Sequence, residues 1–176
     1  MQLRSQQKPP SHPRYPRMTL STDSINDNGS FDPRYTCDLD NSSPELHWDQ
    51  FPENTAGFAL TVEDSDSPVK NFTHWLIYNI PLSITHLPAG IPPQEALPNG
   101  ILQGINSLGK LGYTGPCPPP GDRPHRYLFR VYALATLVTL PRRTDRDTLL
   151  EAIAPFVLST GEIVGTYHRL AQKKAG

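Results

Sequence analysis

Two histidines occupy positions suited to binding chemistry, because each stands at the beginning of an apolar segment typical of a β-strand. His74 opens the segment that ends at Ile80, and His125 opens the one that ends at Ala133. Imidazole can donate hydrogen bonds to an anion, and its charge changes near neutral pH. Because both histidines flank a long Gly- and Pro-rich region, we interpret them as candidate ligands of a small anion rather than as packed strand residues.

A run of acidic residues lies at the end of another apolar segment, in the sequence Glu63-Asp64-Ser65-Asp66-Ser67-Pro68. Three carboxylates within four positions repel one another, so they need hydrogen-bond donors or a positively charged partner. One interpretation is an Asp-rich turn whose side chains accept backbone N–H groups. Another places Asp64 or Asp66 beside His74 and His125 as a two-histidine, one-carboxylate metal set. We predict no metal site and keep this set as an alternative.

The most distinctive segment is the glycine-dense stretch of residues 104–121. Its pattern Gly104-x4-Gly109-Lys110 imitates a phosphate-binding P-loop, but Leu111 stands where a hydroxyl group must reach magnesium. The helix that a P-loop requires is also excluded, because Pro116 follows closely. Glycines let backbone N–H groups approach a ligand, and such donors bind anions without a net positive charge. We therefore reject nucleotide binding and predict an anion-binding rim.

An enzyme is the rival interpretation. Serine, histidine and aspartate are all present, but Ser107 lies outside any nucleophile-elbow pattern, and spacing alone does not establish a triad. We therefore predict no catalytic residue, no cofactor and no enzymatic activity. A metal-dependent or serine hydrolase is the alternative.

The distribution of charge limits the partners of the chain. Its 176 residues carry a net charge of −1, yet residues 1–17 contain four basic side chains and no acidic one. The remaining body is acidic and is a poor match for nucleic acid, whose phosphates need a basic surface. No apolar run reaches the length of a membrane span, and no signal peptide is evident. We predict a disordered basic tail over residues 1–17, a single domain over 18–172 and a cytoplasmic location.

Short apolar segments separated by turns predict a mainly β fold. Twenty prolines exclude long helices and favour stiff connections between short elements. We expect strands in residues 17–25, 57–63, 75–80, 126–133 and 162–167, an extended stretch in 31–35, an irregular region in 82–124 and a helix in 144–156. The predicted architecture is a two-sheet antiparallel β sandwich with one or two short helices.

Taken together, these residues resemble the phosphatidylethanolamine-binding protein family, in its bacterial and archaeal Raf-kinase-inhibitor-like branch. The resemblance runs from about Leu20 to Leu170. The family's signatures stand here in its order, as Ser43-Pro44-Glu45-Leu46-His47-Trp48, Glu63-Asp64-Ser65-Asp66-Ser67-Pro68, His74-Trp75 with Asn79, Gly109-x-x-Gly112-Tyr113-x-Gly115-Pro116-x-Pro118-Pro119, and His125-Arg126-Tyr127. One such motif would be weak, whereas the whole set in register is highly specific.

The resemblance implies a sandwich with a small anion pocket at one end. Carried over by position, Asp66 braces the pocket loop and the pocket itself uses Asp64, His74, Gly115, Pro116, His125 and Tyr127. In the family such a pocket accepts phosphate, acetate and phosphoethanolamine head groups, so we predict a small anion or a phospholipid head group as the ligand. Family members also modulate kinases or inhibit proteases. The alternative is therefore a protease or kinase partner with a vestigial anion site, and a homodimer is also considered.

Two departures from the family pattern affect the pocket. The family's usual Asp-Pro-Asp reads Asp64-Ser65-Asp66 here, and we expect the missing proline to loosen the loop because Ser65 frees a backbone angle and restores an N–H group. The helix that covers the pocket mouth in eukaryotic members is not apparent either. We therefore expect a more open pocket. For the same reason, the resemblance gives weaker support to kinase inhibition by this chain.

The resemblance also suggests a mechanism. We expect Asp64 to orient His74 or His125 and to favour the protonated imidazole. The cationic ring, backbone N–H groups and the Tyr127 hydroxyl would then face the anion, whereas an ethanolamine ammonium would contact Asp64 directly. On this hypothesis, affinity falls as the pH rises above the ordinary histidine pKa of about 6.5.

Two cysteines stand in places where related bacterial sequences also carry cysteines. Cys117 lies in the pocket loop and Cys37 in an early strand region, so the resemblance implies that a disulfide between loop and sandwich is one option. Thiols in the cytosol are kept reduced. Since a cytoplasmic location is predicted, we expect free thiols.

Overall fold

The computed structural model describes residues 15–171, so residues 1–14 of the disordered tail predicted for residues 1–17 lie outside the described residues, as does the predicted domain end at residue 172. Pro16, in the last part of the predicted tail, already contacts the last strand. Its carbonyl oxygen accepts hydrogen bonds from the Thr160 N–H at 3.2 Å and from the Ser159 hydroxyl at 2.7 Å. The chain therefore joins the folded body before residue 18.

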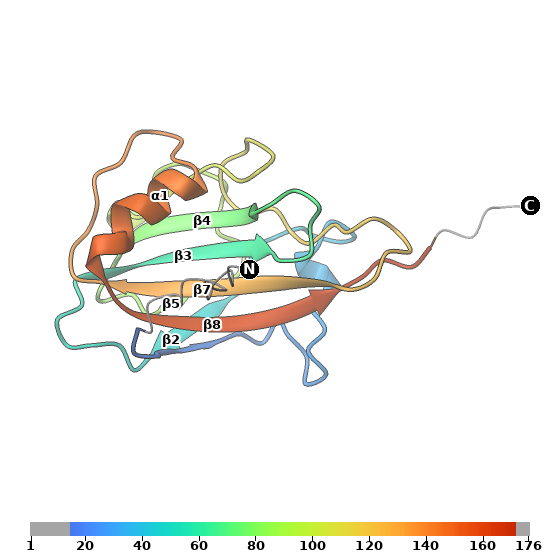
Figure 1. Cartoon of the computed structure of the whole chain (residues 1–176), viewed down its shortest axis with the longest axis horizontal. Helices are drawn as coiled ribbons and strands as arrows, with labels where there is room; N and C mark the ends of the chain where they lie inside the picture. Colours follow the sequence, from blue (N-terminus) through green and yellow to red (C-terminus); the bar gives the residue numbers. More distant parts are fainter. Residues whose placement is uncertain (1–14, 172–176) are drawn as a thin grey trace, which may run out of the picture.

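Within residues 15–171, the strands form two antiparallel sheets, which confirms the predicted sandwich. The smaller sheet has the order β1 (Thr19–Ser21), β2 (Leu46–Asp49) and β5 (His86–Leu87). The larger sheet has the order β6 (Leu102–Gln103), β4 (Phe72–Pro81), β3 (Gly57–Asp64), β7 (His125–Leu134) and β8 (Val157–Tyr167). Figure 1 shows β4, β3, β7 and β8 side by side, with the helix α1 (Arg146–Ile153) packed over one end of this sheet.

Strand β3 is the central strand of the large sheet. Both faces of this sheet are covered by other parts of the chain. Successive side chains of a strand point to opposite faces. Phe58 and Leu60 belong to the main core, which also contains Trp48 of the small sheet. Ala59 belongs instead to a second cluster with Leu149 of α1. Burial of each large apolar side chain contributes about 1.5–3 kcal/mol, so β3 is a rigid support for the acidic segment at its end.

The helical segments differ from two of the predictions. Residues 31–35 were expected to be extended, but Pro33–Tyr35 form the 3-10 helix η1, because the Asp32 carboxylate caps the Arg34 N–H at 2.9 Å and proline fits the first helical turn. The helix predicted for 144–156 is divided into α1 and the 3-10 helix η3 (Ala154–Phe156), which contains the N–H-lacking Pro155. Within residues 15–171, no helix has both the length and the apolarity needed to cross a bilayer.

Strand lengths also differ from the sequence patterns. The last strand begins at Val157 rather than at residue 162, because β8 pairs with β7 along its whole length, from Leu134 opposite Val157 to His125 opposite Tyr167. The first strand is shorter than predicted and covers only Thr19–Ser21. The region 82–124 is not wholly irregular, since it contains β5, the 3-10 helix η2 (Pro98–Gly100) and β6. Short strands of this kind carry too few residues for a visible alternation.

Candidate functional site

The candidate pocket lies where strands of the large sheet end and begin. Because β3 runs antiparallel to both neighbours, its last residue, Asp64, stands opposite Phe72 of β4 and Tyr127 of β7. A hollow of about 310 Å³ opens there, and its lining includes Asp64, His74, Thr114, Gly115, Cys117 and His125. Three predicted residues, Asp66, Pro116 and Tyr127, support this lining without being part of it. The topology thus brings together residues from three separate segments.

Asp64 orients His125 rather than His74. His125 Nδ1 donates a hydrogen bond to Asp64 Oδ2 at 2.8 Å, and Nε2 donates to Asp122 Oδ2 at 3.2 Å. Because ionised carboxylates only accept hydrogen bonds, both ring nitrogens carry protons and the ring is a cation. Burial acts to lower the pKa of His125, but the hydrogen bonds and charges of Asp64 and Asp122 outweigh it and raise the pKa above its ordinary value. The positive charge is therefore balanced by carboxylates.

Asp66 braces the loop after β3 through the neighbouring arginine. Arg126 donates to the Asp66 carboxylate from its backbone N–H at 2.9 Å and from Nε at 2.8 Å. The hydrogen bonds from the Arg126 side chain, only partly opposed by burial, lower the pKa of Asp66 to about 2. The Ser65 N–H donates to the Arg126 carbonyl oxygen at 2.9 Å. The missing proline at position 65 therefore adds a tie, contrary to the expected loosening.

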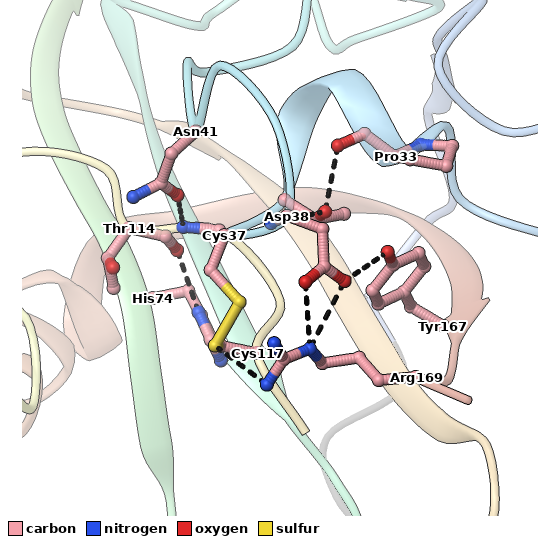
Figure 2. The surroundings of a disulfide bond; sticks show 11 residues. Pro33, Cys37, Asp38, Asn41, His74, Thr114, Cys117, Tyr167 and Arg169 are labelled. Carbon is pink, nitrogen blue, oxygen red and sulfur yellow. Dashed lines mark hydrogen bonds and ion pairs between the residues drawn. A yellow bond between two sulfur atoms is a disulfide. The ribbon is translucent and has the colours of Figure 1, made fainter. Parts of the chain in front are cut away.

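The mechanism allowed either His74 or His125 to be the cation, and His74 is the neutral one of the two rings. Its Nδ1 donates to the Thr114 carbonyl oxygen at 2.7 Å (Figure 2). Its Nε2 is buried and has no hydrogen-bond partner among residues 15–171. Burial lowers the pKa of His74 below its ordinary value, and the Thr114 carbonyl and the Asp64 charge oppose this only in part. At neutral pH the ring is neutral and Nε2 is an acceptor, so the expected cationic ring facing an anion is not found at His74.

Tyr127 brings a hydrogen-bond donor to the same end of the sheet. Its ring is fully buried and packs edge-on against the His74 ring, with the centroids 5.3 Å apart. In the described part of the chain, its hydroxyl group has no hydrogen-bond partner. Burial, followed by the negative charges of Asp64 and Asp66, raises the pKa of Tyr127, so its O–H keeps its proton. Within residues 15–171, the Tyr127 O–H is thus a donor without a partner, and it lies on the ring next to His74, whose Nε2 is an acceptor without a partner.

The glycine-rich rim is fastened to an earlier segment and does not offer the expected backbone donor at Gly115. The Gly115 N–H donates to Asn41 Oδ1 at 2.7 Å. A Cβ atom at position 115 would lie 2.3 Å from the Tyr35 carbonyl oxygen, so only glycine permits this approach. The Pro116 carbonyl oxygen accepts the Cys37 N–H at 3.1 Å. Gly115 and Pro116 therefore hold the pocket wall in place.

Cys37 and Cys117 form a disulfide, which corrects the expectation of free thiols (Figure 2). The two cysteines are 80 residues apart in sequence, but their Cα atoms lie 5.4 Å apart, within the range that a disulfide spans. The contacts of Gly115 and a hydrogen bond of 2.7 Å from the Tyr113 hydroxyl to the Tyr35 carbonyl oxygen bring the segments together. Disulfides are typical of oxidising compartments, so the cytoplasmic location stays a prediction.

An ion pair ties the end of β8 to the same wall. Arg169 Nε donates to Asp38 Oδ1 at 2.9 Å, and the Tyr167 hydroxyl donates to Asp38 Oδ2 at 2.7 Å. Figure 2 shows these three side chains beside the disulfide. The residue after Cys37 therefore links the strand that follows α1 to the pocket wall.

The two enzyme alternatives find little geometric support at the pocket. Ser107 Oγ accepts a hydrogen bond from the Thr73 N–H at 2.8 Å, so it ties the glycine-rich loop to β4. His74 Nδ1 and His125 Nδ1 are engaged by Thr114 and Asp64, as described above. Among residues 15–171, the three-residue group with the spacing of metal ligands lies elsewhere, on the small sheet. The absence of enzymatic activity itself stays a prediction.

Sequence reasoning missed three residues that shape the pocket. Asn41 and Thr114 act through the loop contacts already described, and Asp122 completes the charge balance of His125. Asn41 adopts a φ of 52°, a left-handed conformation in which asparagine is common, so its place in a turn could have been inferred. Asp122 precedes His125 by three residues, and this spacing was also a usable signal.

Comparison with known proteins places the fold and the motifs in one family. The family model described as phosphatidylethanolamine-binding protein matches residues 21–168. A UPF0098 protein of Methanothermobacter thermautotrophicus is 45% identical over 152 residues, which cover 86% of this chain and 99% of that protein.

Two crystal structures agree with this result. Escherichia coli YbcL, described as a new member of the mammalian PEBP family, gives a TM-score of 0.80 at 32% identity, over 86% of this chain and 98% of that one. The PEBP homologue CT736 of Chlamydia trachomatis gives a TM-score of 0.77 at 30% identity, over 87% and 98%. With its motifs, its two-sheet sandwich and its relatives in agreement, the chain belongs to the phosphatidylethanolamine-binding protein family.

Proposed function

We propose that the pocket binds a phosphate group that still carries a proton, either as the free monoanion or as a monoester such as phosphoethanolamine, and that it does so without catalysis. The observation that carries this proposal is the pair of buried atoms without partners in residues 15–171, His74 Nε2 and the Tyr127 hydroxyl. His74 Nε2 can only accept a hydrogen bond, whereas the Tyr127 O–H can donate one. A monoprotonated phosphate offers a P–O–H donor to Nε2 of His74, which belongs to the lining of the hollow, and anionic oxygen acceptors to the Tyr127 O–H, whose ring lies beside the His74 ring.

The charges around the pocket also favour a monoanion. Asp64 and Asp122 carry two negative charges, and His125 carries one positive charge between them. A ligand with two negative charges would be repelled by Asp64 more strongly than a ligand with one. This repulsion is only weakly screened, because the side chain of Asp64 is only 8% exposed. A fully deprotonated phosphate is therefore a poorer ligand than its protonated form.

The ammonium-binding role that was considered for Asp64 is weakened by its hydrogen bonds. Asp64 Oδ2 accepts from His125 at 2.8 Å, and Oδ1 accepts from the Asp66 N–H at 2.8 Å. An ethanolamine ammonium would have to compete with both bonds. The phosphate rather than the amine is thus the part of the head group that the pocket suits.

The size and rim of the pocket fit a head group. A hollow of about 310 Å³ is at the small end of ligand-binding clefts, which measure roughly 300–1,000 Å³. Phe72, Leu108, Pro118 and Pro119 also belong to its lining, and Leu108 is 54% exposed. These apolar side chains are suited to contact the carbon atoms of a small phosphate monoester.

Sulfate provides the sharpest test, because it has the tetrahedral shape of phosphate but carries no proton at neutral pH. Facing His74 Nε2 with a sulfate oxygen leaves a buried acceptor without a hydrogen bond, at a cost of about 1–3 kcal/mol. At pH 7 in a phosphate-free buffer, calorimetric titration should show sulfate binding about 5- to 150-fold more weakly than phosphate or phosphoethanolamine. Equal affinities would overturn the proposal.

The pH dependence gives a second test, and its cause differs from the one first expected. The affinity for phosphoethanolamine should fall as the pH rises from about 6 to 8, because a phosphate monoester loses its last proton near pH 6 while His74 stays neutral. Affinity that does not change between pH 5 and 8 would contradict the proposal. Turnover of phosphate or carboxylate esters that is lost in His74→Ala would show instead that the site is catalytic.

A further inference from the structure

A second group of ligand-type side chains lies on the outer face of the small sheet, in a different sheet from the pocket. His47 of β2 stands directly opposite His86 of β5 in the strand register. Glu45 precedes His47 by two residues, and such residues share a face in an extended chain. One ligand atom from each of these three side chains lies within 4.8 Å of the others. We call this group the outer cluster.

Both histidines of the outer cluster direct the same ring nitrogen at one carboxylate. His47 Nε2 lies 3.5 Å from Glu45 Oε1, and His86 Nε2 lies 3.6 Å from Glu45 Oε2. The two rings are stacked, with their centroids 4.2 Å apart and their planes 20° apart. The stacked rings therefore present Nε2 to the same carboxylate from two neighbouring strands.

The separations in the outer cluster are too long for good hydrogen bonds, which measure about 2.7–3.2 Å for N–H to oxygen. They are close to the spacing of two ligands on one metal ion. With metal–nitrogen and metal–oxygen bonds of about 2.0–2.2 Å, neighbouring ligand atoms of a tetrahedral ion stand roughly 3.3–3.6 Å apart. We propose that Glu45, His47 and His86 form a binding site for a divalent transition-metal ion, with solvent water at the remaining position.

The backbone beneath the outer cluster is held firmly. Leu46 is fully buried and Leu87 is 2% exposed, so the strand positions next to the three ligands are anchored in the core. The Glu45 carbonyl oxygen accepts a hydrogen bond from the Thr22 hydroxyl at 2.6 Å. The ligand side chains themselves are between 37% and 51% exposed, so an ion can reach them from solvent. A fixed backbone with accessible side chains is what an open metal site requires.

The ligand types select the class of metal. Two imidazoles and one carboxylate suit Zn²⁺, Ni²⁺ or Cu²⁺, whereas Mg²⁺ and Ca²⁺ prefer oxygen ligands alone. Strand β5 has only two residues and pairs with β2 at only two positions. A bound ion would join these strands through their side chains, so metal binding should stabilise the edge of the small sheet.

Zinc titration of the whole chain tests this site. The oxidised protein, freed of metal with EDTA and kept without reductant, is titrated calorimetrically with Zn²⁺ in a phosphate-free buffer. We expect one Zn²⁺ per chain. Loss of an outer-shell partner alone costs about 10- to 100-fold in metal affinity, so His86→Ala and Glu45→Gln should each weaken binding at least about tenfold. The matched control His168→Ala removes another exposed histidine and should leave the affinity unchanged.

Nuclear magnetic resonance of the histidine rings supplies an independent measurement on the unaltered chain. Addition of Zn²⁺, but not of Mg²⁺, should shift or broaden the Nε2 signals of His47 and His86 and raise the melting temperature. Absence of these changes at 1 mM Zn²⁺ would overturn the proposal. Zinc affinity that is the same in His86→Ala as in the unaltered chain would overturn it too, because the ion would then be held elsewhere.

Discussion

Replacement of Tyr127 by phenylalanine should affect stability and ligand binding in opposite directions. Tyr127 is fully buried, and its hydroxyl has no hydrogen-bond partner within residues 15–171. The change Tyr127→Phe removes only this hydroxyl and keeps the ring that packs against His74 and His125. If the hydroxyl serves to bind the ligand, its missing hydrogen bond lowers the free energy of unfolding of the ligand-free protein.

The size of both effects follows from the burial of the hydroxyl. A buried donor without a partner costs about 1–3 kcal/mol relative to water. Tyr127→Phe should therefore raise the free energy of unfolding of the ligand-free protein by up to about that amount. The same change removes a hydrogen bond to an anionic oxygen, worth about 1.5–3 kcal/mol. The affinity for phosphate should accordingly fall by roughly 10- to 150-fold.

Urea unfolding in a phosphate-free buffer and calorimetric titration with phosphate measure the two effects. The matched control is Tyr113→Phe, because the Tyr113 hydroxyl donates to the Tyr35 carbonyl oxygen at 2.7 Å. Loss of that bond should lower the free energy of unfolding by about 0.5–1.5 kcal/mol, with little direct effect on phosphate. If Tyr127→Phe lowers stability as Tyr113→Phe does and leaves the phosphate affinity unchanged, the reasoning is refuted.

Three further predictions concern the pocket wall. Reduction of the Cys37–Cys117 disulfide should lower the free energy of unfolding by about 4 kcal/mol, because the bond closes a loop between residues 80 apart; urea unfolding with and without reductant measures the loss, and no loss would contradict the bond. Asp66→Asn should lower the free energy of unfolding at pH 7 by on the order of 1–2 kcal/mol. The pKa of about 2 means that the ionised Asp66 carboxylate stabilises the folded state, and the amide cannot replace that charge. This difference from the unaltered chain should disappear as the pH falls from about 4 to about 2, and unfolding curves at pH 7 and 2.5 test it. Gly115→Ala should lower the melting temperature, because the new methyl group would lie 2.3 Å from the Tyr35 carbonyl oxygen; an unchanged value would show that the wall can shift.

The long strands were predictable because their patterns are local. Residues 57–63 and 126–133 carry enough apolar side chains to specify strands, and the structure extends each by only a residue or two. Val157–Tyr167 was only half predicted. Its first residues include Ser159 and Gly161, which are poor signals of a strand and take that form because β7 offers a partner along the whole length.

The candidate site was predictable in its residue types but not in its charge states. Asp64, His74 and His125 meet at one pocket, as the motifs implied. Which histidine is the cation depends on the neighbours of each ring. His125 lies between two carboxylates, whereas His74 is buried against a carbonyl group. Such neighbours come from segments far apart in sequence, so the motifs alone could not supply them.

The sequence by itself determined the family, the sandwich and four of the residues that line the pocket, namely Asp64, His74, Gly115 and His125, because strand patterns and short motifs are written in neighbouring positions. The tertiary structure alone decided the disulfide, the protonation of the two histidines and the grouping of His86 with Glu45 and His47. Each of these depends on distances of a few ångströms between segments that only folding brings together. Hydrogen bonding, burial and metal coordination all act over such distances.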